Sequence, residues 1–136
     1  MFERKHWSFR SNINFVKGRS ITDGEESPLA HIPPTYGQTS LTYKRNKFKI
    51  EGVINYNAKK PLSEYGPPGS SDNEDEATPE GSLAWQTYNL YSSFKLNEKY
   101  SVNLAMENIF DIHYRPFGSG VSAPGRNFIV SIRGEF

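Results

Sequence analysis

The alternation of apolar and polar side chains is the feature that most constrains this chain. In the last ten residues, NFIVSIRGEF, one set of alternate positions is almost wholly apolar: Phe128, Val130, Ile132, Gly134 and Phe136. The positions between them are mostly polar: Asn127, Ile129, Ser131, Arg133 and Glu135. A period of two is typical of a β-strand with one apolar face. The apolar set therefore faces either a packed core or other apolar surroundings.

The same period recurs along the chain and predicts an all-β fold, an antiparallel meander of about six amphipathic strands. The expected strands cover 7–17, 37–44, 48–56, 83–96, 100–110 and 126–136. No segment shows a convincing helical period. The length of 136 residues corresponds to about one domain.

The connections between these strands alternate in length. The segments 18–36, 57–82 and 111–125 are long, whereas 45–47 and 97–99 are tight turns. Compact soluble sheets mostly use connections of about 4–6 residues. Alternation of long and short connections is typical of a bacterial outer-membrane barrel, which has short periplasmic turns and long extracellular loops. Most of the expected strands are also close to the ~9–11 residues that cross a bilayer.

Aromatic residues gather near the two tight turns and favour the same interpretation. They are Trp7, Tyr43, Phe48, Phe94, Tyr100 and Phe136. On the periplasmic side of a membrane such residues would form an interfacial girdle. The alternatives are a soluble β-barrel or sandwich that binds a ligand and uses the apolar face as its core, and a small outer-membrane barrel with adhesive loops.

The composition excludes several other classes. The net charge of +1 provides no overall field for a charged partner, and the absence of cysteine excludes disulfides and thiolate metal sites. No apolar run approaches the ~18 residues of a transmembrane helix. Basic residues lack the interleaved aromatics of a nucleic-acid surface, so no nucleic-acid partner is expected.

The stretch 103–128, NLAMENIFDIHYRPFGSGVSAPGRNF, resembles the C-terminal end of TonB-dependent outer-membrane receptors. In that family an Asn-Leu/Ile-Phe-Asp run ends the penultimate strand, a Tyr-Arg pair follows, and Pro-Gly-Arg opens the last strand. The matching residues are Asn108, Ile109, Phe110, Asp111, Tyr114, Arg115, Pro124, Gly125 and Arg126. The family's last strand ends in Phe, as here, although Gly134 occupies a position where a bulky residue is frequent.

The resemblance implies a 22-stranded barrel with a plug in its lumen, in the outer membrane of a Gram-negative cell. It implies uptake of a nutrient ligand, such as a siderophore, metal chelate or glycan, driven by the inner-membrane TonB complex. Six strands cannot close a barrel whose minimum is about eight. We therefore expect 1–136 to be the C-terminal portion of a receptor barrel, with the plug and the remaining strands absent.

The resemblance also implies partners and roles. The terminal strand looks like the signal read by the barrel assembly machinery, and its apolar side chains would face outer-membrane lipid: Phe128, Val130, Ile132 and Phe136. Glycan importers of the family pair with a surface lipoprotein. Asn108 and Asp111 are expected to form turns where the strand ends. Three glycines, Gly118, Gly120 and Gly125, are expected to adopt backbone angles that other residues avoid. Arg115 and Arg126 would lie near the loop-side rim, in salt bridges or against lipopolysaccharide phosphates.

No catalytic or cofactor constellation is apparent, and we expect no enzyme activity. His6, His31 and His113 are widely separated and suggest neither a metal site nor a triad. The acidic run at 70–80 could bind calcium through Asp72, Glu74, Asp75 and Glu76, but it lacks the spacing and glycine of an EF-hand loop. A solvated loop is the favoured interpretation of this run.

Overall fold

The computed structural model of the chain describes residues 2–67, 69, 72 and 77–135. Within them the chain forms nine strands and one short 3₁₀ turn. The strands are β1 (Phe2–Arg4), β2 (Trp7–Asn14), β3 (Arg19–Thr22), β4 (Glu25–Pro28), β5 (Tyr36–Arg45), β6 (Phe48–Asn57), β7 (Trp85–Lys95), β8 (Tyr100–Glu107) and β9 (Asn127–Gly134). The 3₁₀ turn is η1 (Leu62–Glu64). In the described part of the chain, no helix has the length and apolar character needed to cross a membrane.

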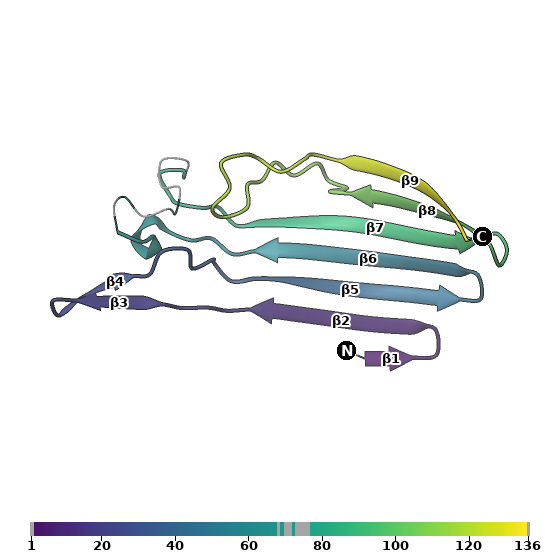
Figure 1. Cartoon of the computed structure of the whole chain (residues 1–136), viewed down its shortest axis with the longest axis horizontal. Helices are drawn as coiled ribbons and strands as arrows, with labels where there is room; N and C mark the ends of the chain where they lie inside the picture. Colours follow the sequence, from purple (N-terminus) through teal and green to yellow (C-terminus); the bar gives the residue numbers. More distant parts are fainter. Residues whose placement is uncertain (1, 68, 70–71, 73–76, 136) are drawn as a thin grey trace.

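Seven strands form one antiparallel sheet in the order β1-β2-β5-β6-β7-β8-β9 (Figure 1). The expected antiparallel meander is therefore confirmed. The expected number of six strands is wrong, because β1 adds to the edge and β3 and β4 form a separate hairpin inside the long connection 18–36. These three strands are too short to show a period. Asp23 and Gly24 form the hairpin turn with positive φ angles of 53° and 84°, as an Asp-Gly turn of this kind requires.

The tight connections lie at one end of the sheet and the long ones at the other, as the alternation in length predicts (Figure 1). Asn46 adopts a positive φ of 51° between β5 and β6. Between β7 and β8, Asn97 Oδ1 accepts hydrogen bonds from the backbone N–H groups of Lys99 (2.9 Å) and Tyr100 (2.8 Å). Asparagine tolerates left-handed backbone and can bond its own turn, which makes both turns tight.

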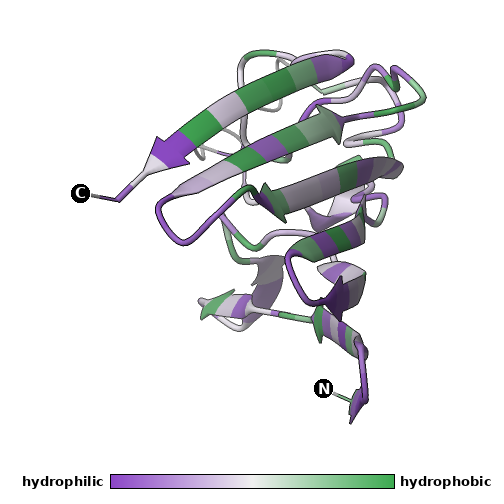
Figure 2. Ribbon diagram, turned by 90° about the vertical axis from the view of Figure 1, so that its right-hand side faces the viewer, coloured by the Kyte–Doolittle hydropathy of each residue, from purple (hydrophilic) through white to green (hydrophobic). Residues whose placement is uncertain are grey.

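The strand register aligns the apolar side chains of neighbouring strands into rows on one side of the sheet, here called the apolar face. One row runs Phe9, Leu41, Gly52, Leu90, Met106 and Phe128 across six strands. The large side chains of this face stay exposed, Ile132 at 73 %. The exposed set includes Trp7, Phe9, Ile13, Leu41, Phe48, Leu90, Phe94, Tyr100, Leu104, Phe128, Val130 and Ile132. Figure 2 shows the resulting alternation of hydropathy along the strands.

The opposite side, the polar face, carries the buried residues of the sheet. Ser40, Asn57, Thr87 and Asn89 are all buried there, with Val53 beside them. A soluble domain buries its apolar side chains and exposes its polar ones, so this sheet has the reverse arrangement.

The last strand follows the expected pattern of faces. Phe128, Val130 and Ile132 pair with apolar-face residues of β8, whereas Asn127, Ser131 and Arg133 lie on the polar face. Ile129, the one apolar residue among the alternate polar positions, lies on the polar face opposite Ala105. Phe136 lies outside the described residues.

The sheet is open, and no closed barrel forms in the part of the chain that the structure describes. β1 and β9 each pair along one side only, which leaves two free edges. All eight residues of β9 are exposed. An edge of this length, with apolar side chains beside it, is a template for pairing with a further strand.

Gly37 and Gly52 provide a test of how tightly the apolar face is packed. The Tyr56 ring lies across Gly37, and its hydroxyl donates a hydrogen bond to the Asn12 carbonyl (2.8 Å). A Cβ on Gly37 would lie 2.6 Å from that hydroxyl and would also meet the Asn12 carbonyl oxygen, whereas a Cβ on Gly52 meets nothing within 4 Å. We expect Gly37→Ala to lower the free energy of unfolding by about 1–3 kcal/mol and Gly52→Ala to raise it slightly. Denaturant unfolding measures both, and equal effects would contradict the packing described here.

Candidate functional site at the loop end of the sheet

Three long connections gather at the end of the sheet opposite the tight turns (Figure 1). They are 15–35 between β2 and β5, 58–84 between β6 and β7, and 108–126 between β8 and β9. Side chains join them to one another. Arg19 and Glu64 form an ion pair of 2.9 Å between the first two connections, and the rings of Tyr65 and Phe117 meet edge to face at 5.6 Å between the last two.

Lys60 contacts all three connections and is only 4 % exposed. Its backbone pairs with Ser82 across the base of 58–84. Its Nζ donates a hydrogen bond to the Ile32 carbonyl (2.6 Å) and lies 3.4 Å from Asp72 Oδ2. The same Nζ is 4.0 Å from the centroid of the Phe117 ring, which is cation–π distance. The Lys60 ammonium therefore stabilises the mutual packing of the three connections.

Asp72 is 2 % exposed, so the expectation of a solvated acidic loop is wrong for this residue. Its carboxylate accepts hydrogen bonds from the backbone N–H groups of His31 (2.6 Å) and Gly66 (2.8 Å). Burial raises the pKa of the Asp72 carboxyl, but these two N–H groups and the Lys60 cation together outweigh burial, so the pKa is lowered overall. The other candidate calcium ligands, Glu74, Asp75 and Glu76, lie outside the described residues.

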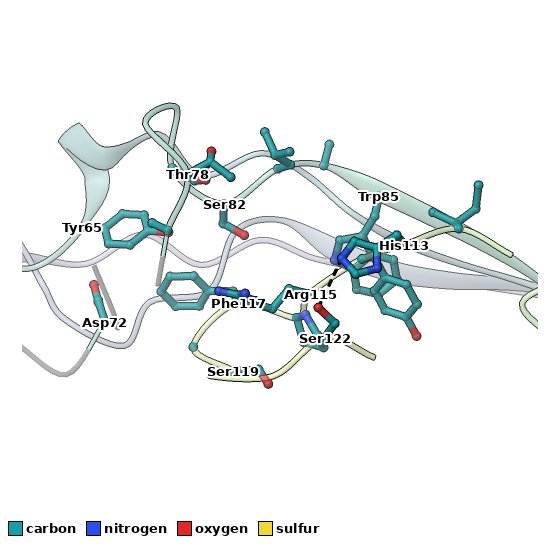
Figure 3. Close-up of a pocket in the computed structure, with 18 residues that line it drawn as sticks. Tyr65, Asp72, Thr78, Ser82, Trp85, His113, Arg115, Phe117, Ser119 and Ser122 are labelled. Atoms are coloured by element: carbon teal, nitrogen blue, oxygen red, sulfur yellow. Dashed lines mark hydrogen bonds between the residues drawn. The ribbon is translucent and has the colours of Figure 1, made fainter. Parts of the chain in front are cut away.

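A cavity of about 250 Å³ lies between the connections 58–84 and 108–126 (Figure 3). Trp85, at the start of β7, and Tyr114 stack at one side, with ring centroids 4.3 Å apart and planes inclined at 38°. The aromatic lining also includes Tyr65 and Phe117. Polar lining groups come from Thr78, Ser82, His113, Arg115, Ser119 and Ser122.

The cavity combines aromatic faces with hydrogen-bonding groups. His113 Nε2 and Ser122 Oγ lie 3.3 Å apart (Figure 3). The buried indole Nε1 of Trp85 has no hydrogen-bond partner among the described residues. A buried N–H of this kind can donate to an acceptor on a bound molecule, and aromatic walls suit a ring-shaped or apolar group. In the described part of the chain, no three His, Cys, Asp or Glu residues cluster in a way that could hold a metal ion.

The motif residues that carry the sequence resemblance meet at a structural joint where β8 ends. Asn108 is 3 % exposed and has a positive φ of 47°. Its backbone N–H donates to Asn89 Oδ1 (2.9 Å), and its own side chain both accepts from the Ile112 N–H and donates to the Ile112 carbonyl (2.9 Å each). Its Nδ2 also lies 3.3 Å from the Pro124 carbonyl. Asn108 therefore stabilises the turn, as expected.

Asp111, Gly125 and Arg126 form the second half of this joint. Asp111 Oδ1 accepts a hydrogen bond from the backbone N–H of Arg126 (2.7 Å). A Cβ on Gly125 would lie 2.5 Å from that same oxygen, so a larger residue here would displace the Asp111 carboxylate from its bond with Arg126. The expectation that Gly120 and Gly125 supply an unusual backbone angle is wrong, whereas Gly118, at φ 73°, fits it. Arg126 Nε donates to the Ile109 carbonyl (2.9 Å) and thus bonds to backbone within the joint.

The other motif residues divide between the joint and the cavity. The Phe110 ring meets the Tyr88 ring edge to face at 5.1 Å, beside the joint. Tyr114 and Arg115 line the cavity, and the backbone carbonyl of Tyr114 accepts from the Ala123 N–H (2.9 Å). Sequence reasoning missed Lys60, Tyr65, Trp85 and Phe117, because nothing in their local pattern shows that three connections meet around them.

Comparisons with known proteins agree with the architecture. No family model and no curated protein matches the chain. Among the solved structures that match is a copper transporter, OprC, with a TM-score of 0.81 over 98 % of this chain at 16 % sequence identity. The fold is shared with a transporter. This chain spans 22 % of the length of that protein, so the likeness concerns one part of it.

The joint can be tested with two asparagines. Asn108→Ala would leave the backbone N–H and C=O groups of Ile112 without their partner, at a cost of about 1–3 kcal/mol in the free energy of unfolding. Asn103→Ala is the matched control, since among the described residues the Asn103 side chain makes only a 3.5 Å hydrogen bond to Ser131 on the polar face. Hydrogen exchange at the Ile112 amide should accelerate in the Asn108 variant alone. A similar acceleration in both variants would contradict the joint.

The Asp72 carboxylate should make the loop end sensitive to acid. Because its folded-state pKa is lowered, its contribution to stability is complete above its usual pKa of 3.8 and is lost as the pH falls through the lower folded value. We expect pepsin to cleave the connections 58–84 and 108–126 progressively faster below about pH 4. Asp72→Asn should weaken this pH dependence. An unchanged profile in that variant would show that another group is responsible.

Proposed function

We propose that this chain is part of the wall of an outer-membrane transport receptor that takes up a nutrient ligand. The observation that supports this most strongly is the exposed apolar face, which extends over the whole main sheet while polar residues are buried on the other side. Soluble monomers rarely expose continuous apolar patches larger than a few hundred Å². Lipid against this face would remove the cost of hydrating it, about 25 cal/mol per Å².

The free edges of the sheet support the same proposal. In a bilayer an unpaired N–H or C=O group costs several kcal/mol, so only a closed ring of strands is stable there. β1 and β9 each need a further neighbour. We propose that additional strands of the receptor supply these neighbours and that the polar face then lines the lumen, next to a plug.

The loop end is the side on which we place the ligand. Its cavity, of about 250 Å³, is smaller than the ~300–1,000 Å³ of a typical small-molecule pocket. It would therefore hold one ring or side group of a larger nutrient, such as a siderophore, metal chelate or glycan, while other loops and the plug hold the rest. By resemblance, the proposed partners are the TonB complex, the barrel assembly machinery and, for a glycan, a surface lipoprotein.

Adjacent residues in the middle of β8 test which face meets lipid. Leu104 lies on the apolar face and Asn103 on the polar face. In the complete receptor, Leu104→Lys should lower the free energy of unfolding in a bilayer by about 2–4 kcal/mol, whereas Asn103→Lys should have a much smaller effect in a hydrated lumen. Heat-modifiable electrophoretic mobility and the amount of folded protein in the outer membrane measure this.

The outcomes separate the proposal from its alternatives. Loss of folded protein in the Leu104 variant only, with retention in the Asn103 variant, supports a lipid-facing apolar face. A wild-type protein that is folded and monomeric in water without detergent would instead identify a soluble binding module. Normal assembly of Leu104→Lys together with failure of Asn103→Lys would mean that the two faces are inverted.

A further inference from the structure

The net charge of +1 conceals a separation of charge along the strands. Basic residues concentrate at the tight-turn end of the sheet. They are Arg4, Lys5, Lys44, Arg45, Lys47, Lys49, Lys95, Lys99 and Arg133, against only Glu3, Glu98 and Glu135 in the same turns and strand ends. A cluster of this density creates a local positive potential that the total charge does not reveal.

The strand register divides these cations between the two faces. Arg4 pairs with Trp7 and Arg45 with Phe48, so both arginines lie on the apolar face. Lys44 pairs with Lys49 on the polar face instead, and Lys95 pairs with Ser101 there. Lys5 and Lys99 lie in the turns themselves. We call the two apolar-face arginines, Arg4 and Arg45, together with the turn lysines Lys5 and Lys99, the outward basic rim. Lys47, the third turn lysine, is left out because its Nζ donates to the Leu96 carbonyl (3.4 Å).

Among the described residues, no carboxylate is held in an ion pair with the outward basic rim. All four residues are exposed, and none of them forms an ion pair with a carboxylate in the described part of the chain. Lys49, on the other face, differs because it pairs with Glu51 at 2.7 Å. The positive charge of the rim is therefore available to an external partner.

Exposed aromatic residues of the apolar face lie directly beside the rim. Trp7 and Phe48 are the register partners of the two arginines. Phe94 is in turn the partner of Phe48, and Tyr100 begins β8 at the same end. Aromatic rings of this kind settle at the boundary between hydrocarbon and headgroups. Long cationic side chains placed beside such aromatic rings, at the end of an apolar face, can extend to the depth of lipid phosphates.

We propose that the outward basic rim binds the phosphate groups of anionic phospholipids in the leaflet at the tight-turn end. The inference rests on the proposed function, because it requires the apolar face to be in lipid. Two features favour anionic phospholipids as the partner: the positive charge of the rim complements their phosphates, and the rim adjoins the apolar face that would contact their acyl chains. Anionic headgroups would hold the wall at a fixed depth and add to the affinity of this end for the membrane.

A fluorescence experiment on the complete receptor tests the rim. The chain contains no cysteine, so Phe2→Cys, with any cysteines elsewhere in the receptor replaced by serine, can carry a single bimane label on the apolar face, two residues from Arg4. Quenching by brominated phosphatidylglycerol is compared with quenching by brominated phosphatidylcholine in vesicles at low salt. We expect preferential quenching by the anionic lipid, and a decrease in this preference of about fivefold or more in the double variant Arg4→Gln/Arg45→Gln.

The matched control is Lys44→Gln/Lys95→Gln, which removes two cations of the same end from the polar face. This control should retain the preference for anionic lipid. In the parent protein and in the control alike, 1 M salt should abolish the preference, since the Debye length is then only about 3 Å. Equal quenching by the two lipids in the parent protein would overturn the proposal, as would equal losses in the two double variants. A label that neither lipid quenches would instead count against the apolar face being in lipid, and hence against the proposed function.

Discussion

Each strand of the main sheet has to keep its apolar side chains on one side, because a slip of one residue would move the whole set to the other face. Every other property of the structure depends on this register. The turns at Asn46 and Asn97 set it at one end, and the joint around Asn108 sets it at the other. The Tyr56 ring over Gly37 adds a side-chain contact near the loop end of the register between β5 and β6.

The main sheet was largely predictable because its signal is local. A period of two over eight or more residues identifies a strand, and short turns between such strands fix their antiparallel order. β1 and the β3–β4 hairpin were not predicted, because strands of three or four residues cannot show a period. The Asp23-Gly24 turn was nevertheless a usable signal for the hairpin. The role of Gly125 was misjudged for a related reason: its neighbour Asp111 approaches only after the connection has folded back.

The loop end could not be predicted in the same way. Burial of Lys60 and Asp72 depends on contacts between connections that are far apart in the sequence, and the local sequence around each residue looks like a solvated loop. The motif residues were recognisable as a group, yet most of them hold the backbone together. Tyr114 and Arg115 alone among them line the cavity. A sequence motif can thus mark a folding joint next to a site without itself being the site.

The position of Lys60 also has a consequence for the order of events during assembly. Its ammonium contacts Ile32, Asp72 and Phe117, which belong to three connections separated by several strands. The entropy of closing these long loops has to be overcome before the contacts can form, and this closure is slow for sequence-distant pairs. The loop end should therefore become ordered only after β8 has paired with its neighbours. Amide hydrogens near Lys60 would then become protected from exchange late in folding, after the tight turns at the other end have formed.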